Sequence, residues 1–184
     1  HPDDLAAGLA SVQRHVDGLS PMHEWEVRYR CKDGSWRWVL SRAKIVERDS
    51  AGAARLLSGT NTDITERKRL ELAQAEAFTV FANSLEAIMV ISLERRIVKV
   101  NPAFTRITGY RADDVAEQPL TLLASSYHDA AFHEALWSAV REHGSWRGEV
   151  WGRRQDGEAY PESLSISTVR DPLGTPQHYV GVFS

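Results

Sequence analysis

The sequence is short of cysteine, of long apolar runs and of net charge. It has one cysteine, Cys31, among 184 residues, which excludes an internal disulfide framework and a multi-cysteine zinc site. No stretch approaches the roughly 18–20 apolar residues that a membrane-spanning helix needs, and no secretory apolar segment stands at the start. The net charge of −3 argues against a nucleic-acid binder driven by bulk charge. We therefore expect a cytoplasmic chain with no nucleic-acid partner.

Catalytic signatures are missing as well. The sequence has no G-x-S-x-G, no phosphate-binding loop and no H-E-x-x-H, and the His128-Asp129 pair lacks the further ligands of a metal-dependent phosphohydrolase. The hydrophobic content of 42% and the charged content of 26% are those of an ordinary globular domain. We therefore predict a folded module that is not an enzyme and holds no metal. It begins at His1 rather than Met, and we interpret it as a piece of a longer protein.

What the sequence does contain is part of itself twice. Residues 26–62 and 149–184 follow the same pattern of charged, aromatic and β-branched residues, and the Asp-Gly turn at 32–34 aligns with the one at 155–157. A repeat of this length indicates two copies of one folding unit. It favours two domains in a chain whose length alone is compatible with one.

The first copy has the pattern of one helix followed by three strands. Apolar residues at spacings of three and four predict a helix over 3–17. Alternation of apolar and charged residues predicts half-buried strands over 24–31 and 36–40, and a third strand follows over 56–62. Because Asp-Gly readily takes the positive φ of a tight hairpin, we expect an antiparallel meander.

A helical segment follows the first copy. The sequence D-I-T-E at 63–66 has the spacing of a capping box, and residues 66–81 are rich in good helix formers. An apolar stripe runs along the segment at heptad-like spacing: Leu70, Ala73, Ala77 and Val80. The stripe fits either a dimer contact with a second copy of the chain or a contact with one of the two domains, and the run is too short to choose between them.

The second copy is longer. Asn101 caps a helix that has Pro102 at its first position and stops at Gly109. The whole order is two strands, short helices, one long amphipathic helix and three strands, over residues 88–93, 97–100, 101–123, 128–142, 146–154, 159–169 and 177–184.

With these residues the second copy resembles a PAS domain, the sensory module of bacterial signalling proteins. The resemblance is carried by N-P-A-F-T-R-I-T-G-Y at 101–110, A-L-W at 135–137, G-S-W-R-G-E-V-W at 144–151, R-R-Q-D-G at 153–157 and G-V-F-S at 181–184. The first copy resembles the C-terminal half of another PAS domain, through H-P-D-D at 1–4, K-D-G-S-W-R-W at 32–38 and G-T-N-T-D-I-T-E-R-K at 59–68.

The resemblance implies an α+β fold: a five-stranded antiparallel sheet with helices on one face, present in two copies joined by a helix. Residues 1–65 would be the C-terminal part of a first PAS domain whose N-terminal strands are missing. Residues 66–81 would be a helical linker, and residues 76–184 a second, nearly complete PAS domain.

The resemblance also implies a sensory and dimerisation role. Such modules stand upstream of histidine kinases or of cyclic-di-GMP cyclases and phosphodiesterases, and they detect a small ligand, a redox state or a partner. We expect a homodimer formed through helices or sheet faces, and an output domain in the same parent protein. Anchoring of the parent protein in the inner membrane stays open. The linker would carry the signal, with Asp63, Thr65, Leu70 and Ala77 as relay residues.

Four residues are candidates for the ligand pocket: Trp137, Trp151, Asn101 and Phe104. In flavin-binding members of the family a tryptophan in the segment matching A-L-W lies near the flavin, and the stretch over 135–157 resembles a nitrogen-fixation redox sensor that holds FAD. That pattern has Asn where this chain has Gly152. FAD therefore stays open as the cofactor, beside another small ligand and beside a ligand-free interaction scaffold whose core is filled by its own side chains.

Two other cofactor chemistries are disfavoured. Haem needs an axial histidine, and His128 and His133 would lie on the long helix, but both stand among polar residues, and we expect His133 to be solvated. Cys31 lies in the first meander rather than after the early helix where a flavin-adduct cysteine would stand, so it is predicted to be a structural thiol.

Overall fold

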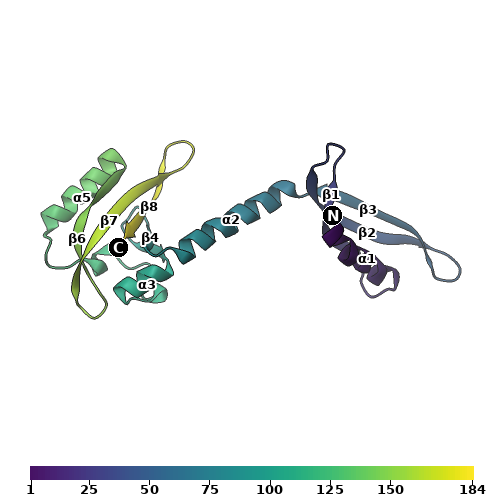
Figure 1. Cartoon of the computed structure of the whole chain (residues 1–184), viewed down its shortest axis with the longest axis horizontal. Helices are drawn as coiled ribbons and strands as arrows, with labels where there is room; N and C mark the ends of the chain where they lie inside the picture. Colours follow the sequence, from purple (N-terminus) through teal and green to yellow (C-terminus); the bar gives the residue numbers. More distant parts are fainter. The chain divides into compact units, whose positions relative to one another are not determined.

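The computed structural model describes all of residues 1–184 and divides into two compact units, unit 1 (His1–Glu76) and unit 2 (Ala77–Ser184). Each unit has its own antiparallel sheet (Figure 1). The boundary between the units falls within helix α2, Thr65–Asn83.

Unit 1 contains the predicted helix and three-stranded meander. Helix α1 spans Pro2–Val16, and the strands are β1 (His23–Arg30), β2 (Trp36–Arg48) and β3 (Ala54–Asp63). They pair in the order β1-β2-β3, and Gly34 in the first hairpin turn has the positive φ of 85° that the Asp-Gly sequence predicts.

Helix α1 packs against the edge strand β1. The Asp4 carboxylate accepts a hydrogen bond from the backbone N–H of Arg28 at 2.9 Å and two from the Arg28 guanidinium at 2.9 and 2.6 Å. These bonds lower the pKa of Asp4 to about 2. The helix thereby covers part of an open strand edge, which would otherwise present unpaired backbone groups.

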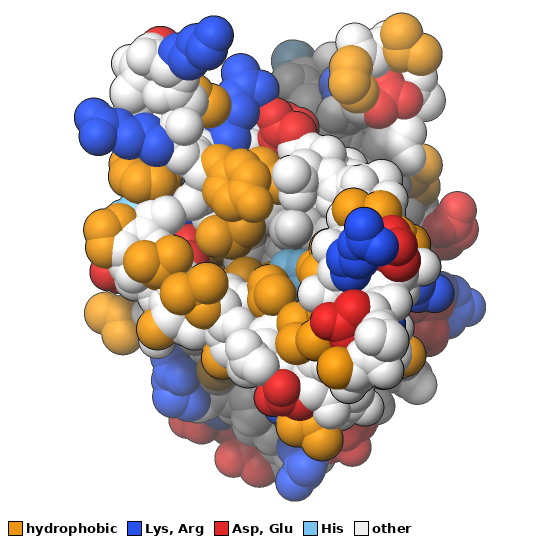
Figure 2. All heavy atoms as spheres, turned by 90° about the vertical axis from the view of Figure 1, so that its right-hand side faces the viewer, with side chains coloured by type: hydrophobic (Ala, Val, Ile, Leu, Met, Phe, Trp, Pro, Cys, Tyr) orange, Lys and Arg blue, Asp and Glu red, His pale blue; other side chains and the backbone are white.

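The hydrophobic core of unit 1 is small. Its buried hydrophobic residues are Val39 and Ile64. The alternation predicted for β1 is only partly present, because Tyr29 is exposed whereas Arg28 is half-buried, with its guanidinium 5.3 Å from the centre of the Trp38 ring. Figure 2 shows hydrophobic side chains exposed among charged ones on this unit.

Helix α2 is slightly longer than predicted and contains no buried residue. Its start follows the D-I-T-E sequence, but the capping box is incomplete. Asp63 accepts from the backbone N–H of Thr65 at 2.9 Å, whereas the Glu66 side chain accepts from Arg69 at 3.0 Å. All four residues of the predicted apolar stripe are exposed in the single chain.

Unit 2 has the predicted five-stranded antiparallel sheet. The strands are β4 (Ala87–Ile91), β5 (Ile97–Val100), β6 (Ser145–Arg153), β7 (Ala159–Arg170) and β8 (Pro176–Phe183), in the order β5-β4-β8-β7-β6. Between β5 and β6 lie α3 (Pro102–Thr108), α4 (Ala112–Val115), the short 3-10 helix η1 (Leu120–Leu123) and α5 (Ala130–His143).

The helices cover the inner face of this sheet, and the core lies beneath them. Phe104 of α3 and Val140 of α5 are fully buried with Ile166 of β7 and Phe183 of β8. Alternate residues of β7 from Tyr160 to Ile166 are buried, as expected for a sheet with one covered face.

The termini of the helices follow the sequence signals. Asn101 caps α3, Gly109 ends it with a φ of 81°, and Gly144 ends α5 with a φ of 80°. The predicted start of α5 was wrong: its N-cap is Asp129, so His128 lies in the preceding loop. The Asp129 side chain accepts a hydrogen bond from the free N–H of Phe132 in the first turn, as a helix cap does. The acceptor nitrogen of His128 is bonded to the Trp151 N–H instead.

Candidate functional site

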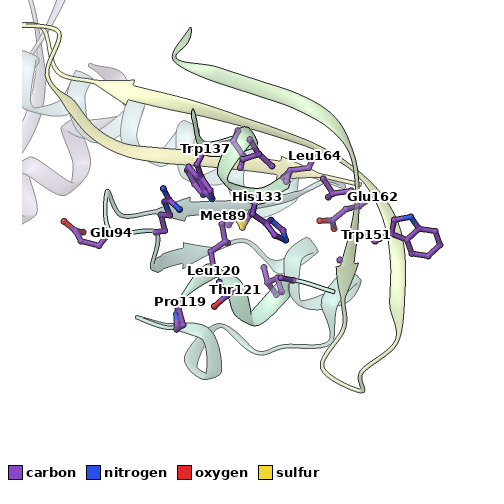
Figure 3. Close-up of a pocket in the computed structure, with 17 residues that line it drawn as sticks. Met89, Glu94, Pro119, Leu120, Thr121, His133, Trp137, Trp151, Glu162 and Leu164 are labelled. Carbon is purple, nitrogen blue, oxygen red and sulfur yellow. The ribbon is translucent and has the colours of Figure 1, made fainter. Parts of the chain in front are cut away.

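Unit 2 contains a cavity of about 310 Å³ between the inner face of the sheet, η1 and α5 (Figure 3). Its walls are mainly apolar and include Met89 of β4, Leu136 of α5 and Ile166 of β7. A cavity of this size with few polar groups is typical of a small-molecule site.

Trp137 forms one wall of the cavity. It is 5% exposed, and its ring meets Tyr179 of β8 at a centroid distance of 5.2 Å in an edge arrangement. The Arg95 guanidinium lies 4.9 Å from the centre of the ring and forms an ion pair with Glu134 at 3.7 Å. A cationic side chain therefore stands over an aromatic wall.

Trp151 contributes to the rim. It is 38% exposed, and its ring stacks on Tyr127 at 4.6 Å and points away from the cavity (Figure 3). Its backbone N–H donates to Nε2 of His128 at 3.0 Å, so this ring nitrogen is the acceptor of the bond. His128 is thus occupied with the backbone of β6.

Asn101 and Phe104 are not among the cavity-lining residues. Oδ1 of Asn101 accepts from the N–H groups of Ile88 and Phe104 at 2.9 and 3.0 Å, and Nδ2 donates to the carbonyls of Phe81 and Glu86 at 3.2 and 2.9 Å. All four bonds join backbone segments, so Asn101 has no hydrogen-bonding capacity left for a ligand. Phe104 packs edge-on against another core aromatic, Phe183, at 5.9 Å.

Glu162 is the main polar group that the sequence analysis missed. It lies on the buried face of β7, is 9% exposed and lines the cavity. Burial raises its pKa to about 7, and a hydrogen bond from Tyr160 and the charge of Arg154 act in the opposite direction. Oε2 has no hydrogen-bond partner. Alternation along A-Y-P-E-S-L-S-I could have placed Glu162 on the inner face beside Leu164.

Gly152 makes room for this carboxylate. A Cβ atom at position 152 would lie 3.1 Å from the Tyr160 ring and 3.2 Å from Cδ of Glu162. The place where the FAD-holding pattern has an Asn side chain is therefore next to the buried pair of Tyr160 and Glu162. A longer side chain at position 152 would have to displace them.

His133 also lines the cavity and is half-buried, so its side chain is less exposed than the sequence suggested. Figure 3 shows it reaching into the cavity from α5, as Glu162 does from β7. Burial lowers the pKa of His133, and the neighbouring His128 lowers it further. The imidazole is therefore kept neutral near neutral pH, when it can both donate and accept a hydrogen bond.

The predicted relay residues fall into two groups. Asp63 accepts from Arg37 at 2.7 Å, and Oγ1 of Thr65 accepts from the backbone N–H of Trp38 at 3.0 Å, so both attach the start of α2 to β2. Leu70 and Ala77 are exposed on α2.

Cys31 is a free, partly buried thiol at the end of β1 in unit 1. No group of three or more His, Cys, Asp and Glu side chains is gathered as a metal site would require, and no helix is both long and apolar enough to cross a bilayer.

Comparison with known proteins agrees with this α+β architecture. Residues 85–184 match the family model described as PAS domain, and residues 1–61 match one described as PAS fold. The first match covers more than half of the chain, and the chain therefore belongs to the PAS domain family.

Three similar proteins illustrate the range of this family. A nitrogen fixation regulatory protein of Klebsiella oxytoca is 31% identical over 105 residues, which are 57% of this chain and 21% of the relative. A blue-light-activated histidine kinase of Brucella abortus is 34% identical over 84 residues, 46% of this chain and 17% of the relative. The crystal structure of a PAS domain from Colwellia psychrerythraea superimposes with a TM-score of 0.58 at 20% identity, covering 61% of this chain and 95% of that one. The chain thus spans about a fifth of the length of the curated relatives it matches.

Proposed function

We propose that the chain is a sensory module of a larger signalling protein and that unit 2 binds a small molecule in the cavity lined by Trp137 and Glu162. The observation that carries the proposal is the cavity itself, about 310 Å³ with mainly apolar walls and a buried carboxylate. Membership of the PAS domain family and similarity to regulatory proteins and a histidine kinase support it.

Unit 1 is proposed to be part of a second PAS domain. The internal repeat and the match of residues 1–61 to a PAS fold model support two copies, with residues 1–65 as the partial copy, 66–81 as the linker and 76–184 as the nearly complete copy. The output domain is proposed to be a histidine kinase or an enzyme of cyclic-di-GMP turnover, and this chain is proposed to have no catalytic activity of its own.

Helix α2 is proposed to relay the state of the cavity. Its start is attached to β2 of unit 1 through the bonds of Asp63 with Arg37 and of Thr65 with Trp38, and its last turn is attached to unit 2 through the bond from Asn101 to the Phe81 carbonyl. A ligand shifts such a relay only if its affinity differs between two arrangements of the helix.

One insertion experiment tests the relay. Inserting one residue after Leu72 rotates the following part of α2 by about 100°, whereas inserting seven residues restores the facing to within about 20°. In the parent protein we expect the one-residue insertion to abolish the response of the output domain and the seven-residue insertion to retain it. Equal responses from both variants would refute the relay.

The exposed stripe of α2 is proposed to form a homodimer contact. Leu70 is 60% exposed and Val80 is 72% exposed in the single chain. Neighbouring apolar side chains exposed to water are typical of a surface that binds another protein. Leu70→Glu is expected to shift the chain to monomer in sedimentation. Leu72→Glu, equally exposed but outside the stripe, is the matched control and should leave the mass unchanged.

A cavity-filling variant tests ligand binding. Val150→Phe adds a ring to the cavity wall, whereas Val98→Phe adds the same ring at an exposed position of β5. We expect toluene, as a small apolar probe, to raise the melting temperature of the wild type and of Val98→Phe but not that of Val150→Phe. Equal shifts in all three proteins would show that the cavity is not where the probe binds.

The second candidate function is redox sensing with bound FAD, and it is favoured by Trp137 in the cavity wall. An absorption spectrum of the purified chain tests it, because flavins absorb visible light and bare protein does not. Flavin bands that disappear in Trp137→Ala would place redox sensing first. A flat spectrum from protein supplied with FAD would exclude it and leave a colourless ligand or a ligand-free scaffold.

A further inference from the structure

The Glu162 carboxylate is a buried acid with an unused oxygen. It is more than nine-tenths buried, and Oε2 has no hydrogen-bond partner. Tyr160 lies two residues away on the same buried face of β7, and its hydroxyl acts to lower the pKa of Glu162 against the effect of burial. Buried polar groups are nearly always paired, and an unpaired one costs about 1–3 kcal/mol. Such an oxygen at a cavity wall indicates a donor that is supplied from within the cavity.

The cations near the cavity do not supply that donor. Arg154 follows β6 and pairs with a carboxylate of its own hairpin turn at 3.1 Å. Arg95 precedes β5 and is engaged with the face of Trp137 and with a carboxylate of α5. His133 faces the cavity from α5 and makes no hydrogen bond to Glu162, and Glu94 adds a second carboxylate to the lining. Oε2 of Glu162 therefore stays without a donor from the protein.

The remaining walls favour a flat apolar body. Trp137 offers an aromatic face, and Met89, Leu136 and Ile166 complete an apolar lining. The flexible thioether side chain of Met89 can pack against a planar ring held between aromatic and aliphatic walls.

We propose that the ligand of this cavity is a small ring compound carrying a nitrogen donor group, an amine or amidine, which donates a hydrogen bond to Oε2 of Glu162 while its ring packs against Trp137. This rests on the proposed function, since it assigns a chemical class to the ligand of the same cavity. A carboxylate opposite an N–H⁺ donor forms a charge-assisted bond, about twice as strong as a neutral one.

Three probes of one shape test the class of ligand. Benzamidine carries the donor group, benzoate carries an acceptor of the same shape, and toluene carries neither. Their affinities for the full chain are measured through the fluorescence of Trp137, compared with Trp137→Phe. We expect benzamidine to bind at least tenfold more tightly than toluene, and benzoate to bind more weakly than toluene, because two carboxylates would face each other.

Matched variants assign the effect to Glu162. Glu162→Gln keeps the size of the side chain and removes its charge, and we expect it to weaken benzamidine binding at least tenfold without changing toluene binding. Glu149→Gln makes the same change at an exposed position of the neighbouring strand and should leave both affinities unchanged. Melting temperatures of both variants verify that they are folded.

The pH dependence gives an independent readout. With the pKa of Glu162 at about 7, lowering the pH from about 8 to about 6 should weaken benzamidine binding by about tenfold, since only the ionised carboxylate forms the bond. Benzamidine stays protonated throughout, and Glu162→Gln should remove the dependence.

The outcomes separate the two proposals. Binding of toluene with no preference for benzamidine, or a benzamidine affinity unchanged in Glu162→Gln, would overturn the assignment of a nitrogen donor and leave the cavity as a ligand site. Failure of all three probes to change Trp137 fluorescence would overturn the proposed function together with it.

Discussion

Replacing Asn101 by alanine should destabilise unit 2 far more than the loss of an ordinary helix cap. The side chain is 1% exposed and makes four hydrogen bonds to backbone groups of α3, β4, the end of α2 and the segment after it. Losing a cap costs about 1 kcal/mol, and each buried group left without a partner costs about 1–3 kcal/mol. Besides the capped N–H of Phe104, three backbone groups lose their partner, and some of them will bind water instead. We therefore expect a loss of about 3–5 kcal/mol in the free energy of unfolding, a large fraction of the stability of a typical domain.

Two matched variants separate the cap from the other bonds. Asn101→Ser keeps a good N-cap acceptor but cannot reach all four groups, so it should recover only about 1 kcal/mol of the loss. Asp129→Ala removes the cap of α5, whose side chain accepts one bond, from Phe132 at 2.8 Å, and should cost about 1 kcal/mol.

The assay is urea denaturation combined with hydrogen exchange at the Thr168 amide, which donates to the Gly144 carbonyl within unit 2 and keeps that bond in both variants. Residue-resolved exchange is needed because two units that unfold separately do not yield a single unfolding free energy. If Asn101→Ala cost no more than Asp129→Ala, the side chain would be an ordinary cap, and the reasoning from the four bonds would be refuted.

Three further predictions concern packing and pH. Asp4→Asn should loosen α1 from β1, which would appear as faster hydrogen exchange in α1; unchanged exchange would refute the role of the ion pair with Arg28. In the wild type the same loosening should appear as the pH falls from about 4 towards about 2, because the pKa of Asp4 is about 2 in the folded state and 3.8 in the unfolded state. Burial, and then the neighbouring His15, lower the pKa of His23 from 6.5, so its contribution to the stability of unit 1 is fully present above that pH and is lost as the pH falls below it. Urea denaturation at a series of pH values should therefore show a steeper loss in the wild type than in His23→Gln. Gly59→Ala should cost more than about 2 kcal/mol of unfolding free energy, because its Cβ would lie 2.1 Å from a backbone carbonyl oxygen of β2. At Gly181 a Cβ would meet side-chain atoms, with the nearest two from Met89 at 2.6 and 3.0 Å, so Gly181→Ala should cost less; equal losses, measured by hydrogen exchange within each unit, would contradict this difference.

The elements of both units could be predicted from the sequence because their signals are local. The Asn-Pro start and glycine end of α3, and the alternation along β7, depend on residues a few positions apart. The start of α5 was missed by two residues because Asp129, rather than a residue before His128, provides the cap.

The candidate site was predictable only in part. Trp137 was a candidate because it lies in an amphipathic helix and in a motif of the family, and the structure places it in the cavity wall. Glu162 was missed because a single acid in a strand has the appearance of a solvent-facing residue until its face is known. Asn101 was assigned to the pocket, although its bonds to Ile88 and Phe81 depend on segments that are far from it in the sequence.

The central claim is that the cavity of unit 2 binds a small molecule against Trp137. The most direct test is the nitrogen-15 spectrum of the six tryptophan indoles during a benzamidine titration, assigned with single Trp→Phe variants. The account predicts a saturable shift of the Trp137 signal and unchanged signals for Trp25, Trp36 and Trp38 of unit 1. A Trp137 signal that stays fixed while benzamidine and toluene are raised to saturation of the solution would contradict it.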